Sequence, residues 1–483
     1  MDQNRTPIFE AITKYIEKNP AYFRIPGHRF ERGINKRWKD AVGENIFKYD
    51  LTEASMLDDL HNPEGTIKEA QDLASEVFGA EHSYFLVNGT TCGNEAMIMT
   101  TAFQGDQIAI PRNAHKSALM GLIIGGAEPL YIMPELSEEW GIQGGIRPEK
   151  VEELFQKNPN CKGILVVNPT YYGICSDLEG IAAVCHKYGA TLLVDEAHGA
   201  HLYFSEQLPK GAIEQGADMC AQSIHKVTGS LTQSSMLHVK SKLVDVEKLE
   251  ANLHIVQSTS PSYLLMTSLD MARQDLAING RNMIDHAVNL AEYARTEINK
   301  IDGMVCLGKE VIGSNGIKDV DLTRLIISGK SLGITGFELA QLLEDEYNVD
   351  MELSDYINVL AIVTYANTME DMERLVEALR KIAAKRKNGV VISNEIFLPE
   401  QPDYVISPRQ AYFSKSKIVS WEEAKGKIAA EMIAPYPPGI PVIYPGERMT
   451  NQVWEYVESY RIRKRHLHGP ADKELKTFKI IEE

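Results

Sequence analysis

The chain has 483 residues, of which 44% are hydrophobic and 24% charged, a composition typical of a globular protein with two or three domains. Fifty Lys and Arg stand against 67 Asp and Glu, which gives a formal net charge of −17. This acidity argues against a nucleic-acid binder, because such proteins present a basic face, and it fits a cationic small substrate.

The cysteines are scattered, with neither a CxxC pair nor the spacing of metal ligands, which favours free thiols in a reducing compartment: Cys92, Cys161, Cys175, Cys185, Cys220 and Cys306. No apolar segment of a signal peptide is visible near Met1. No run approaches the roughly 20 apolar residues of a membrane span. We therefore expect a cytoplasmic protein that does not enter a membrane.

Short apolar runs alternate with amphipathic stretches through residues 36–275. The pattern predicts strands at Tyr84–Val87, Gln107–Ile110, Leu130–Met133, Gly163–Val167, Thr191–Val194, Met219–Ser223 and Met236–Val239. Helical patterns such as Pro148–Gln156 and Leu178–Tyr188 lie between them, and Pro148 suits a first helical turn. This alternation predicts an α/β protein with a large, doubly wound, mostly parallel sheet.

The pattern changes after about Asp270. A long helix is predicted at Asp285–Ile301, followed by short elements at Leu322–Ser328, Phe337–Tyr347, Val359–Tyr365 and Met369–Lys385. The basic run that ends at Gly389 indicates a helix C-terminus, and proline is frequent from Val390 onward. We expect an N-terminal arm (1–35), a large cofactor-binding domain (36–275), a small α+β domain (276–388) and a C-terminal domain (389–483).

Two strand ends carry the clearest chemical signal. The run Leu192–Asp195 ends in a carboxylate, and the later run ends in Ser-x-His-Lys at Lys226. The lysine amine can form a Schiff base with the aldehyde of pyridoxal phosphate (PLP). The aspartate can keep the pyridine nitrogen protonated, so that the ring acts as an electron sink. Together and in this order, the two motifs predict PLP chemistry.

A phosphate site is predicted at a strand-to-helix turn. Thr90 and Thr91 follow a predicted strand and precede the helical stretch Glu95–Ala102. Hydroxyl and backbone N–H groups at a helix N-terminus bind anions, although a threonine there can also be a plain helix cap. Ser223 and His225 flank the candidate lysine and are further phosphate ligands or ordinary loop residues.

His115 follows the strand Gln107–Ile110, at the edge of an α/β sheet where ligands bind. Its imidazole could stack on a flat ring, although a lone histidine is more often a surface or core residue. Glu196 and His198 could instead share a metal ion. Asp195 and Glu196 point to opposite faces of their strand, and the lysine downstream favours the organic cofactor, so no metal site is predicted.

The chain resembles the Orn/Lys/Arg decarboxylases of PLP fold type I, in particular the short Gram-positive-type biosynthetic arginine decarboxylases. The resemblance rests on ordered segments across nearly the whole chain: Arg24–His28, Leu57–His61, Asn88–Asn94, Pro111–Ser117, Asn168–Gly173, Val194–Gly199, Ser223–Lys226, Gly229–Ser235 and Tyr436–Pro441 through Glu447.

The resemblance implies a role for each matching residue. Lys226 would form the Schiff base, Asp195 would bind the pyridine nitrogen, His115 and Ala197 would lie on the two ring faces, and His198 would lie near the phenolic oxygen. The implied phosphate ligands are Thr90, Thr91, Ser223 and His225, with Thr259 reaching the cofactor of a neighbouring subunit. The implied assembly is at least a homodimer with shared active sites.

The implied reaction is decarboxylation of a basic amino acid, foremost L-arginine to agmatine and CO2 in polyamine biosynthesis. Lysine and ornithine, giving cadaverine and putrescine, stay open because they differ from arginine only in length and head group. Transamination by the same fold and a binding protein without a cofactor also stay open. Asp58, Asp59 and Glu447 are candidates for binding the distal cation of the substrate, or are surface carboxylates.

Overall fold

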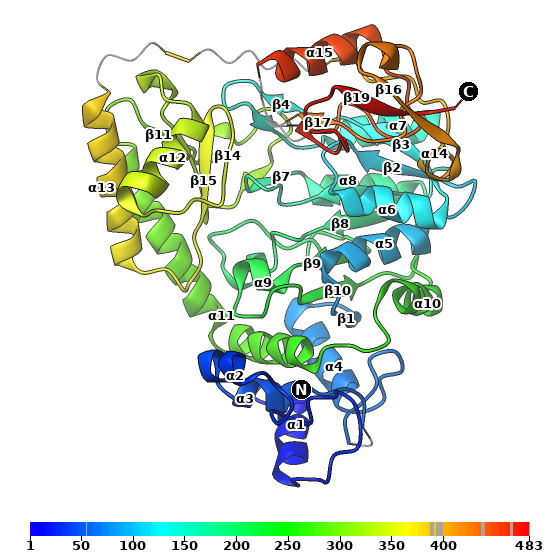
Figure 1. Cartoon of the computed structure of the whole chain (residues 1–483), viewed down its shortest axis with the longest axis vertical. Helices are drawn as coiled ribbons and strands as arrows, with labels where there is room; N and C mark the ends of the chain where they lie inside the picture. The colour runs from blue at the N-terminus through cyan, green and yellow to red at the C-terminus, as the bar shows by residue number, and fades with distance from the viewer. Residues whose placement is uncertain (55, 387–390, 393–398, 436–439, 464–466, 483) are drawn as a thin grey trace.

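The computed structural model describes residues 1–54, 56–386, 391–392, 399–435, 440–463 and 467–482. Its centre is a seven-stranded sheet (Figure 1) in the order β1 (His82–Leu86), β10 (Ser235–Val239), β9 (Met219–Gln222), β8 (Thr191–Asp195), β6 (Gly163–Val167), β2 (Gln107–Pro111) and β3 (Glu128–Ile132). The pairs from β9 to β3 are parallel, and β10 alone runs in the opposite direction, antiparallel to both of its neighbours, β9 and β1. The predicted mostly parallel sheet is confirmed, and all seven predicted strands occur within two residues of their expected bounds.

Helices cover both faces of this sheet. One face carries α5 (Gly89–Thr101), α6 (Lys116–Gly125) and α10 (Val246–Val256), and the other carries α7 (Pro148–Lys157) and α8 (Leu178–Lys187). The strand residues divide accordingly, because successive side chains of a strand point to opposite faces. In β8, Leu193 lies in the core under α5, α6 and α10, whereas Leu192 and Val194 lie in the core under α7 and α8.

The helix α11 (Tyr263–Ile298) has 36 residues and connects the large domain to the small one. Its first half was not predicted, and the expected boundary at 275/276 falls inside it. Asp270 and Arg273 are fully buried in that half, so polar residues interrupt the apolar spacing that a buried helix face normally shows.

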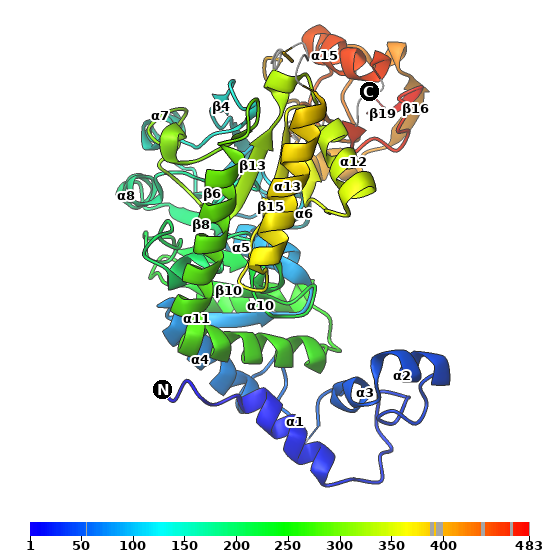
Figure 2. The ribbon, with the colours of Figure 1, turned by 90° about the vertical axis from the view of Figure 1, so that its left-hand side faces the viewer.

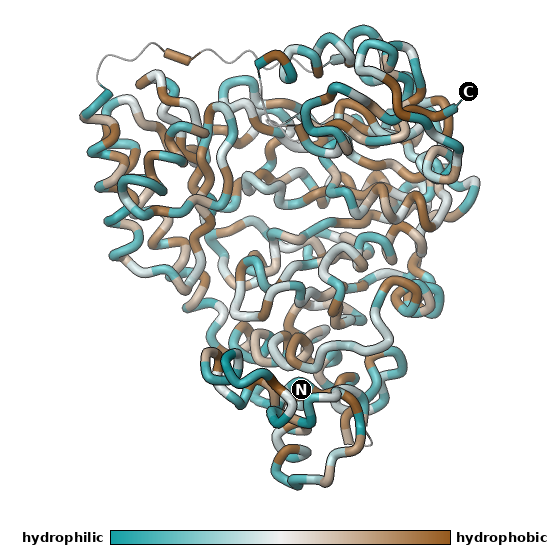
Figure 3. Tube along the Cα trace, in the orientation of Figure 1, coloured by the Kyte–Doolittle hydropathy of each residue, from teal (hydrophilic) through white to brown (hydrophobic). Residues whose placement is uncertain are grey.

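The small domain is an antiparallel sheet packed against two helices. Its order is β11 (Val305–Cys306), β13 (Arg324–Ser328), β15 (Asn358–Ile362) and β14 (Leu353–Ser354), with α12 (Gly336–Tyr347) and α13 (Met369–Lys385). Hydrophilic and hydrophobic segments alternate along α13 (Figure 3), as expected of a helix with one buried face. Two small pairs complete the region: β7 (Ile174–Cys175) with β12 (Asp319–Val320), and β4 (Leu136–Ser137) with β5 (Ile142–Gln143).

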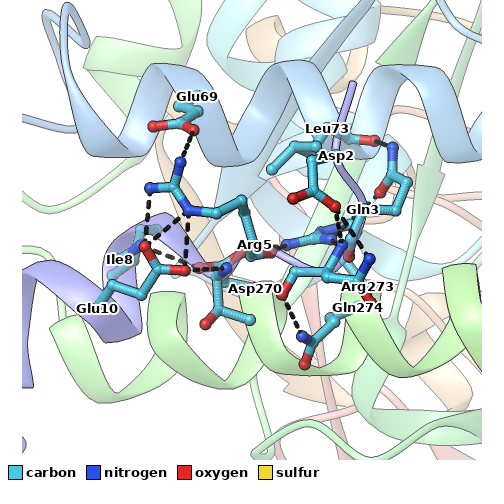
Figure 4. A network of polar contacts seen from close by, with 12 residues as sticks. Asp2, Gln3, Arg5, Ile8, Glu10, Glu69, Leu73, Asp270, Arg273 and Gln274 are labelled. Carbon is cyan, nitrogen blue, oxygen red and sulfur yellow. Dashed lines mark hydrogen bonds and ion pairs between the residues drawn. The ribbon is translucent and has the colours of Figure 1, made fainter.

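The N-terminal segment projects from the body of the molecule (Figure 2) and contains α1 (Pro7–Glu17), α2 (Lys36–Val42) and α3 (Asn45–Tyr49), followed by α4 (Thr66–Phe78). Buried charges hold its start against α11 (Figure 4). Asp270 Oδ2 accepts the Ile8 N–H at 3.0 Å, and Arg273 donates to the carbonyls of Gln3 and Arg5 at 2.9 and 2.5 Å. The arm is therefore anchored where it leaves the large domain.

The C-terminal domain contains α14 (Pro408–Phe413), β16 (Ser416–Ser420), β17 (Ala434–Pro435), α15 (Asn451–Ile462), β18 (Leu467–His468) and β19 (Thr477–Ile481). Its own core forms around the buried Trp421. Arg409 joins it to the large domain by donating to the carbonyls of Ile123 and Ile124 at 2.7 Å each. Tyr436–Gly439 of the proline-rich motif lie outside the described residues. None of the described helices is long and apolar enough to cross a membrane.

Candidate active site

Asp195 and Lys226 meet at the carboxyl edge of the central sheet. Asp195 is the last residue of β8, and Lys226 lies in the short helix α9 (Ile224–Val227), which directly follows β9. Because β8 and β9 are parallel neighbours, their carboxyl ends open on the same edge, where open α/β sheets bind ligands. The structure thus brings together the two residues on which the prediction of PLP chemistry rests.

Asp195 is a buried carboxylate with neutral partners. Its Oδ2 accepts from Asn94 Nδ2 at 2.7 Å, and its Oδ1 accepts from the Ala197 N–H at 3.2 Å. In the described part of the chain no cation forms an ion pair with it. A buried anion is costly unless a cation pairs with it. The site therefore fits a cofactor that brings a protonated ring nitrogen.

Lys226 contacts His198. The distance between Lys226 Nζ and His198 Nε2 is 3.0 Å. Burial lowers the pKa of the Lys226 amine; Asp195 and Glu352 oppose this effect and Arg324 adds to it. Burial and the nearby Lys226 also hold the pKa of His198 well below its usual range, so the imidazole stays neutral. A lysine with a lowered pKa is more often the free amine, which is the form that attacks an aldehyde.

Hydroxyl groups converge at the N-terminus of α5. Thr90 Oγ1 lies 2.7 Å from Ser223 Oγ and 3.1 Å from Ser235 Oγ. Gly89 has a φ of +74°, which glycine adopts without strain, and the open backbone there leaves the first turn of α5 accessible. This arrangement fits a phosphate group, because hydroxyls and the positive end of a helix dipole both favour an anion.

The remaining predicted cofactor contacts lie on α5, α6 and the segments that follow β8 and β9. Thr91 follows Thr90 in the first turn of α5, and His225 Nδ1 lies 2.8 Å from the Ser234 carbonyl. His115 is the N-cap residue of α6, and its Nδ1 lies 2.9 Å from Ser117 Oγ. Burial lowers the pKa of His115, and the negative charge of Asp195 opposes this effect. Ala197 is half-buried beside Asp195.

Glu447 is not available as a substrate ligand. Its two oxygens accept from Arg112 Nη1 and Nη2 at 2.7 and 2.8 Å, and Oε2 also accepts the Tyr444 N–H at 2.7 Å. Both side chains of the ion pair are buried. The expectation that Glu447 binds the distal cation is therefore wrong, because a cation already saturates this carboxylate.

Among the described residues, no hydrogen bond or ion pair joins Asp58, Asp59 or Thr259 to Lys226. Asp58 caps the start of α4, since its Oδ2 accepts the N–H groups of Gly65 and Ile67 at 2.8 and 3.0 Å. Asp59 accepts from the His61 N–H at 2.8 Å. Thr259 is exposed in the loop after α10. The structure gives Asp58 a local structural role, while roles of Asp59 and Thr259 in a neighbouring subunit stay predictions.

Glu196, which could have shared a metal ion with His198, is occupied by other partners. It accepts from Ala212 N, Gln222 Nε2 and Tyr203 Oη at 2.7, 2.8 and 2.9 Å. Burial raises its pKa to about 7. Among the described residues no group of three or more His, Cys, Asp and Glu could hold a metal ion.

Several site residues were missed by the sequence analysis. Asn94 binds Asp195 and also donates to Ser117 Oγ at 2.9 Å. Arg324 donates to the His198 carbonyl at 3.0 Å and pairs with Asp321. Asn94 ends the segment Asn88–Asn94 that carried the family resemblance but was given no role there, and no motif marks Arg324, because each gains its importance from neighbours distant in sequence.

A second missed pair links the two domains beside the lysine. The Tyr171 ring lies 4.4 Å from the His198 ring and 5.9 Å from Lys226 Nζ, measured to ring centroids. The Tyr171 hydroxyl donates to Glu352, which immediately precedes β14 of the small domain. Tyr171 belongs to a segment that carried the family resemblance, but no pattern in the chain pairs it with Glu352.

Known proteins similar to this chain agree with the geometry. Curated relatives include the arginine decarboxylases of Halalkalibacterium halodurans, 42% identical over 100% of this chain and 98% of the relative, and of Bacillus subtilis, 41% identical over 100% and 99%.

Solved structures with the same fold include the Francisella novicida lysine decarboxylase, with a TM-score of 0.83 at 24% identity, covering 99% of this chain and 81% of that chain. Lysine decarboxylase A from Pseudomonas aeruginosa has a TM-score of 0.85 at 23% identity, covering 99% and 80%. These likenesses confirm the predicted fold, which is fold type I of the PLP enzymes.

Two family descriptions together span most of the chain. Residues 6–371 match the major domain of the Orn/Lys/Arg decarboxylases, and residues 391–473 match their C-terminal domain. The chain therefore belongs to the Orn/Lys/Arg decarboxylase family, as its ordered motifs indicated.

Proposed function

We propose that the chain uses PLP to decarboxylate L-arginine to agmatine and CO2. One observation carries the proposal. Asp195, a buried carboxylate without an ion-pair partner among the described residues, lies at the same edge of the sheet as Lys226. Full-length relatives named as arginine decarboxylases support arginine as the substrate. When bound, PLP supplies an electron sink for the pair of electrons left by the departing CO2.

The residues present fit each part of the cofactor. Lys226 would hold its aldehyde and Asp195 its ring nitrogen, with His115 and Ala197 on the two ring faces. The implied phosphate ligands are Thr90, Thr91, Ser223 and His225, to which the structure adds Ser235. Asn94 orients the Asp195 carboxylate through its 2.7 Å hydrogen bond. Fixed donors and acceptors of this kind need no rearrangement when charge develops.

Decarboxylation also requires a proton at the carbon that loses CO2. Lys226 Nζ and His198 Nε2 are 3.0 Å apart, so the imidazole holds the amine in place at the site. The lowered pKa of His198 makes it a poor proton acceptor, so the proton stays on the Lys226 ammonium, which donates it to the carbon and becomes the free amine. The Tyr171 ring and the Arg324 guanidinium limit the movement of His198 by contacting its ring and its carbonyl. We assign the proton transfer to Lys226 and a positioning role to His198.

The proposed assembly is a homodimer in the cytoplasm. The exposed Thr259 and the loop that carries Asp59 are free to reach a second subunit. His61 Nε2 lies 2.9 Å from the Ser258 carbonyl, which joins these two loops into one surface. All six cysteines are free and buried, which supports a reducing compartment.

A turnover assay with arginine, lysine and ornithine side by side tests the proposal. The expected result is CO2 and agmatine from arginine, with slower release of cadaverine or putrescine from the other two. A keto acid as the product would indicate transamination instead. Absence of any bound PLP would indicate a binding protein without a cofactor.

The Lys226→Ala variant serves as the control. Borohydride reduction of the wild type should fix the cofactor on the peptide that contains Lys226, as detected by mass spectrometry. The variant should retain no reducible attachment and essentially no turnover. A reducible adduct on another lysine would contradict the assignment of Lys226.

A further inference from the structure

The carboxylates around the site differ in how many hydrogen-bond and ion-pair partners their oxygens already have. Asp195 is buried at the end of the sheet with Asn94. Asp321 forms an ion pair with Arg324 at 3.5 Å, and its Oδ2 lies 3.0 Å from His201 Nε2. Neither carboxylate can bind the distal cation of a basic amino acid, because Asp195 lies at the cofactor end and Asp321 is already paired with Arg324.

Two tyrosines of one turn connect the large domain to two carboxylates of the small domain. The Tyr172 hydroxyl donates to Asp355 Oδ2 at 2.6 Å, and Asp355 is buried and accepts further bonds from the N–H groups of Ile357 and Asn358. Tyr171 makes the corresponding bond to Glu352, through Oε1. The saturated pair fixes the position of the turn, and the second pair lies on the side of Lys226.

Glu352 differs from Asp355 because it is exposed and one of its carboxylate oxygens is available. Its Oε2 has no hydrogen-bond or ion-pair partner among the described residues. The Glu352 N–H donates to the Leu360 carbonyl at 3.0 Å, so its backbone is fixed at the start of β14. Glu352 is also close enough to Lys226 to oppose the lowering of that lysine's pKa.

We infer that Glu352, oriented by the Tyr171 hydroxyl, binds the distal cation of the substrate, with the Tyr171 ring beside it. This inference rests on the proposed function. The ring centroid lies 5.9 Å from Lys226 Nζ and the hydroxyl on the same ring donates to Glu352, so Tyr171 connects the reacting end to this carboxylate. A guanidinium is planar and can both pair with a carboxylate and stack on an aromatic face, whereas an ammonium is a compact point charge. The pair therefore favours arginine over lysine and ornithine.

Two substrates of the same shape, one with a distal charge and one without, separate this role from a general effect on the fold. Glu352→Gln keeps the shape and the bond from Tyr171 but removes the negative charge. We expect kcat/KM for L-arginine to fall about 10- to 100-fold, mainly through a higher KM, because a hydrogen bond to a charged group is lost. L-citrulline, which has arginine's shape without the charge, should react equally slowly with wild type and variant. Glu344→Gln, an exposed carboxylate on α12, is the control for the change in net charge.

Tyr171→Phe removes the hydroxyl that orients Glu352 and keeps the ring. Like Glu352→Gln, it should lower kcat/KM for arginine and leave kcat/KM for citrulline unchanged, but the loss for arginine should be smaller. An equal loss for arginine and citrulline in the Glu352→Gln variant, or no loss for either, would overturn the inference.

Binding of product analogues tests the inference even if no decarboxylation is found. In a titration of the PLP-loaded protein, Glu352→Gln should weaken agmatine binding about 10- to 100-fold and leave pentylamine binding unchanged, since pentylamine has no distal cation. If the wild type turns over none of the three basic amino acids, but Glu352→Gln still binds agmatine more weakly than the wild type does, the proposed function alone is rejected. Unchanged agmatine affinity would reject the role of Glu352 alone.

Discussion

Arg112 and Glu447 form a buried ion pair between the large domain and the C-terminal domain. Two parallel hydrogen bonds of 2.7 and 2.8 Å join the guanidinium to the carboxylate. The Tyr131 and Tyr444 rings stack on each other with centroids 4.9 Å apart, and both lie near the guanidinium, at 4.9 and 5.0 Å from its central carbon. Arg112 ends the β2 segment that leads to His115, so the C-terminal domain holds this side of the site in place.

Glu447→Ala should therefore destabilise the protein and loosen the cofactor. Removing one partner of a buried ion pair leaves an uncompensated charge and costs about 3–5 kcal/mol. We expect a lower urea midpoint together with weaker PLP binding, measured by equilibrium unfolding and by cofactor titration. A double Arg112→Met and Glu447→Leu variant, which leaves no unpaired charge, should recover much of the stability. Wild-type stability of the single variant would contradict the structural role assigned to the pair.

Asp195→Asn should separate cofactor binding from rate. The amide keeps the size of the carboxylate but cannot stabilise a protonated ring nitrogen, and an unprotonated pyridine is a poor electron sink. We expect PLP to remain partly bound while kcat falls by orders of magnitude. Asn94→Ala offers a milder comparison, because it keeps the carboxylate and removes the 2.7 Å hydrogen bond that orients it, together with the bond to Ser117. Near-normal turnover of Asp195→Asn would show that Asp195 is only a strand-end residue.

The sheet could be predicted because its strands are buried on both faces and appear as continuous apolar runs. Asp195 and Lys226 could be predicted because each ends such a run. The first half of α11 could not, since its buried Asp270 and Arg273 are satisfied by the N-terminal arm, more than 260 residues away in sequence.

The site itself was predictable only where its residues belong to local motifs. Tyr171 and Glu352 are 181 residues apart, and only the docking of the small domain brings them together. Glu447 has an acidic side chain near a motif of the family, which suggested a substrate ligand. Its partner Arg112 lies 335 residues earlier, so the sequence alone did not reveal that the carboxylate is already paired.

Glu196 predicts a pH dependence of stability. Burial raises its pKa from 4.5 to about 7, so the folded state holds a proton that the unfolded state releases at lower pH. Its contribution to stability is fully present below pH 4.5 and is lost as the pH rises through about 7. The shift corresponds to about 3 kcal/mol.

Glu196→Gln should remove this part of the pH dependence. Ala212, Gln222 and Tyr203 donate to Glu196, and the amide brings two donor hydrogens where the protonated carboxyl brings one, so the variant has an extra donor without an acceptor and should be less stable at pH 5. The difference between wild type and variant should shrink by pH 8, as measured by urea unfolding at the two pH values. An unchanged difference across this range would mean that Glu196 stays ionised in the folded protein.

Complementation between inactive variants tests the shared active site. Lys226→Ala lacks the lysine, and a Thr259→Ala, Asp59→Ala double variant lacks the groups expected to reach the partner's site. Each protein alone should have little activity. A hybrid dimer contains one complete site, with Lys226 from one subunit and Thr259 and Asp59 from the other. If subunits exchange at random, half of the dimers are hybrids and each has one complete site out of two. Mixing should therefore restore up to about a quarter of wild-type activity. Exchange is followed by fluorescence energy transfer between labelled subunits. Exchange without recovered activity would contradict the shared site, and a fully active monomer in sedimentation would reject it outright.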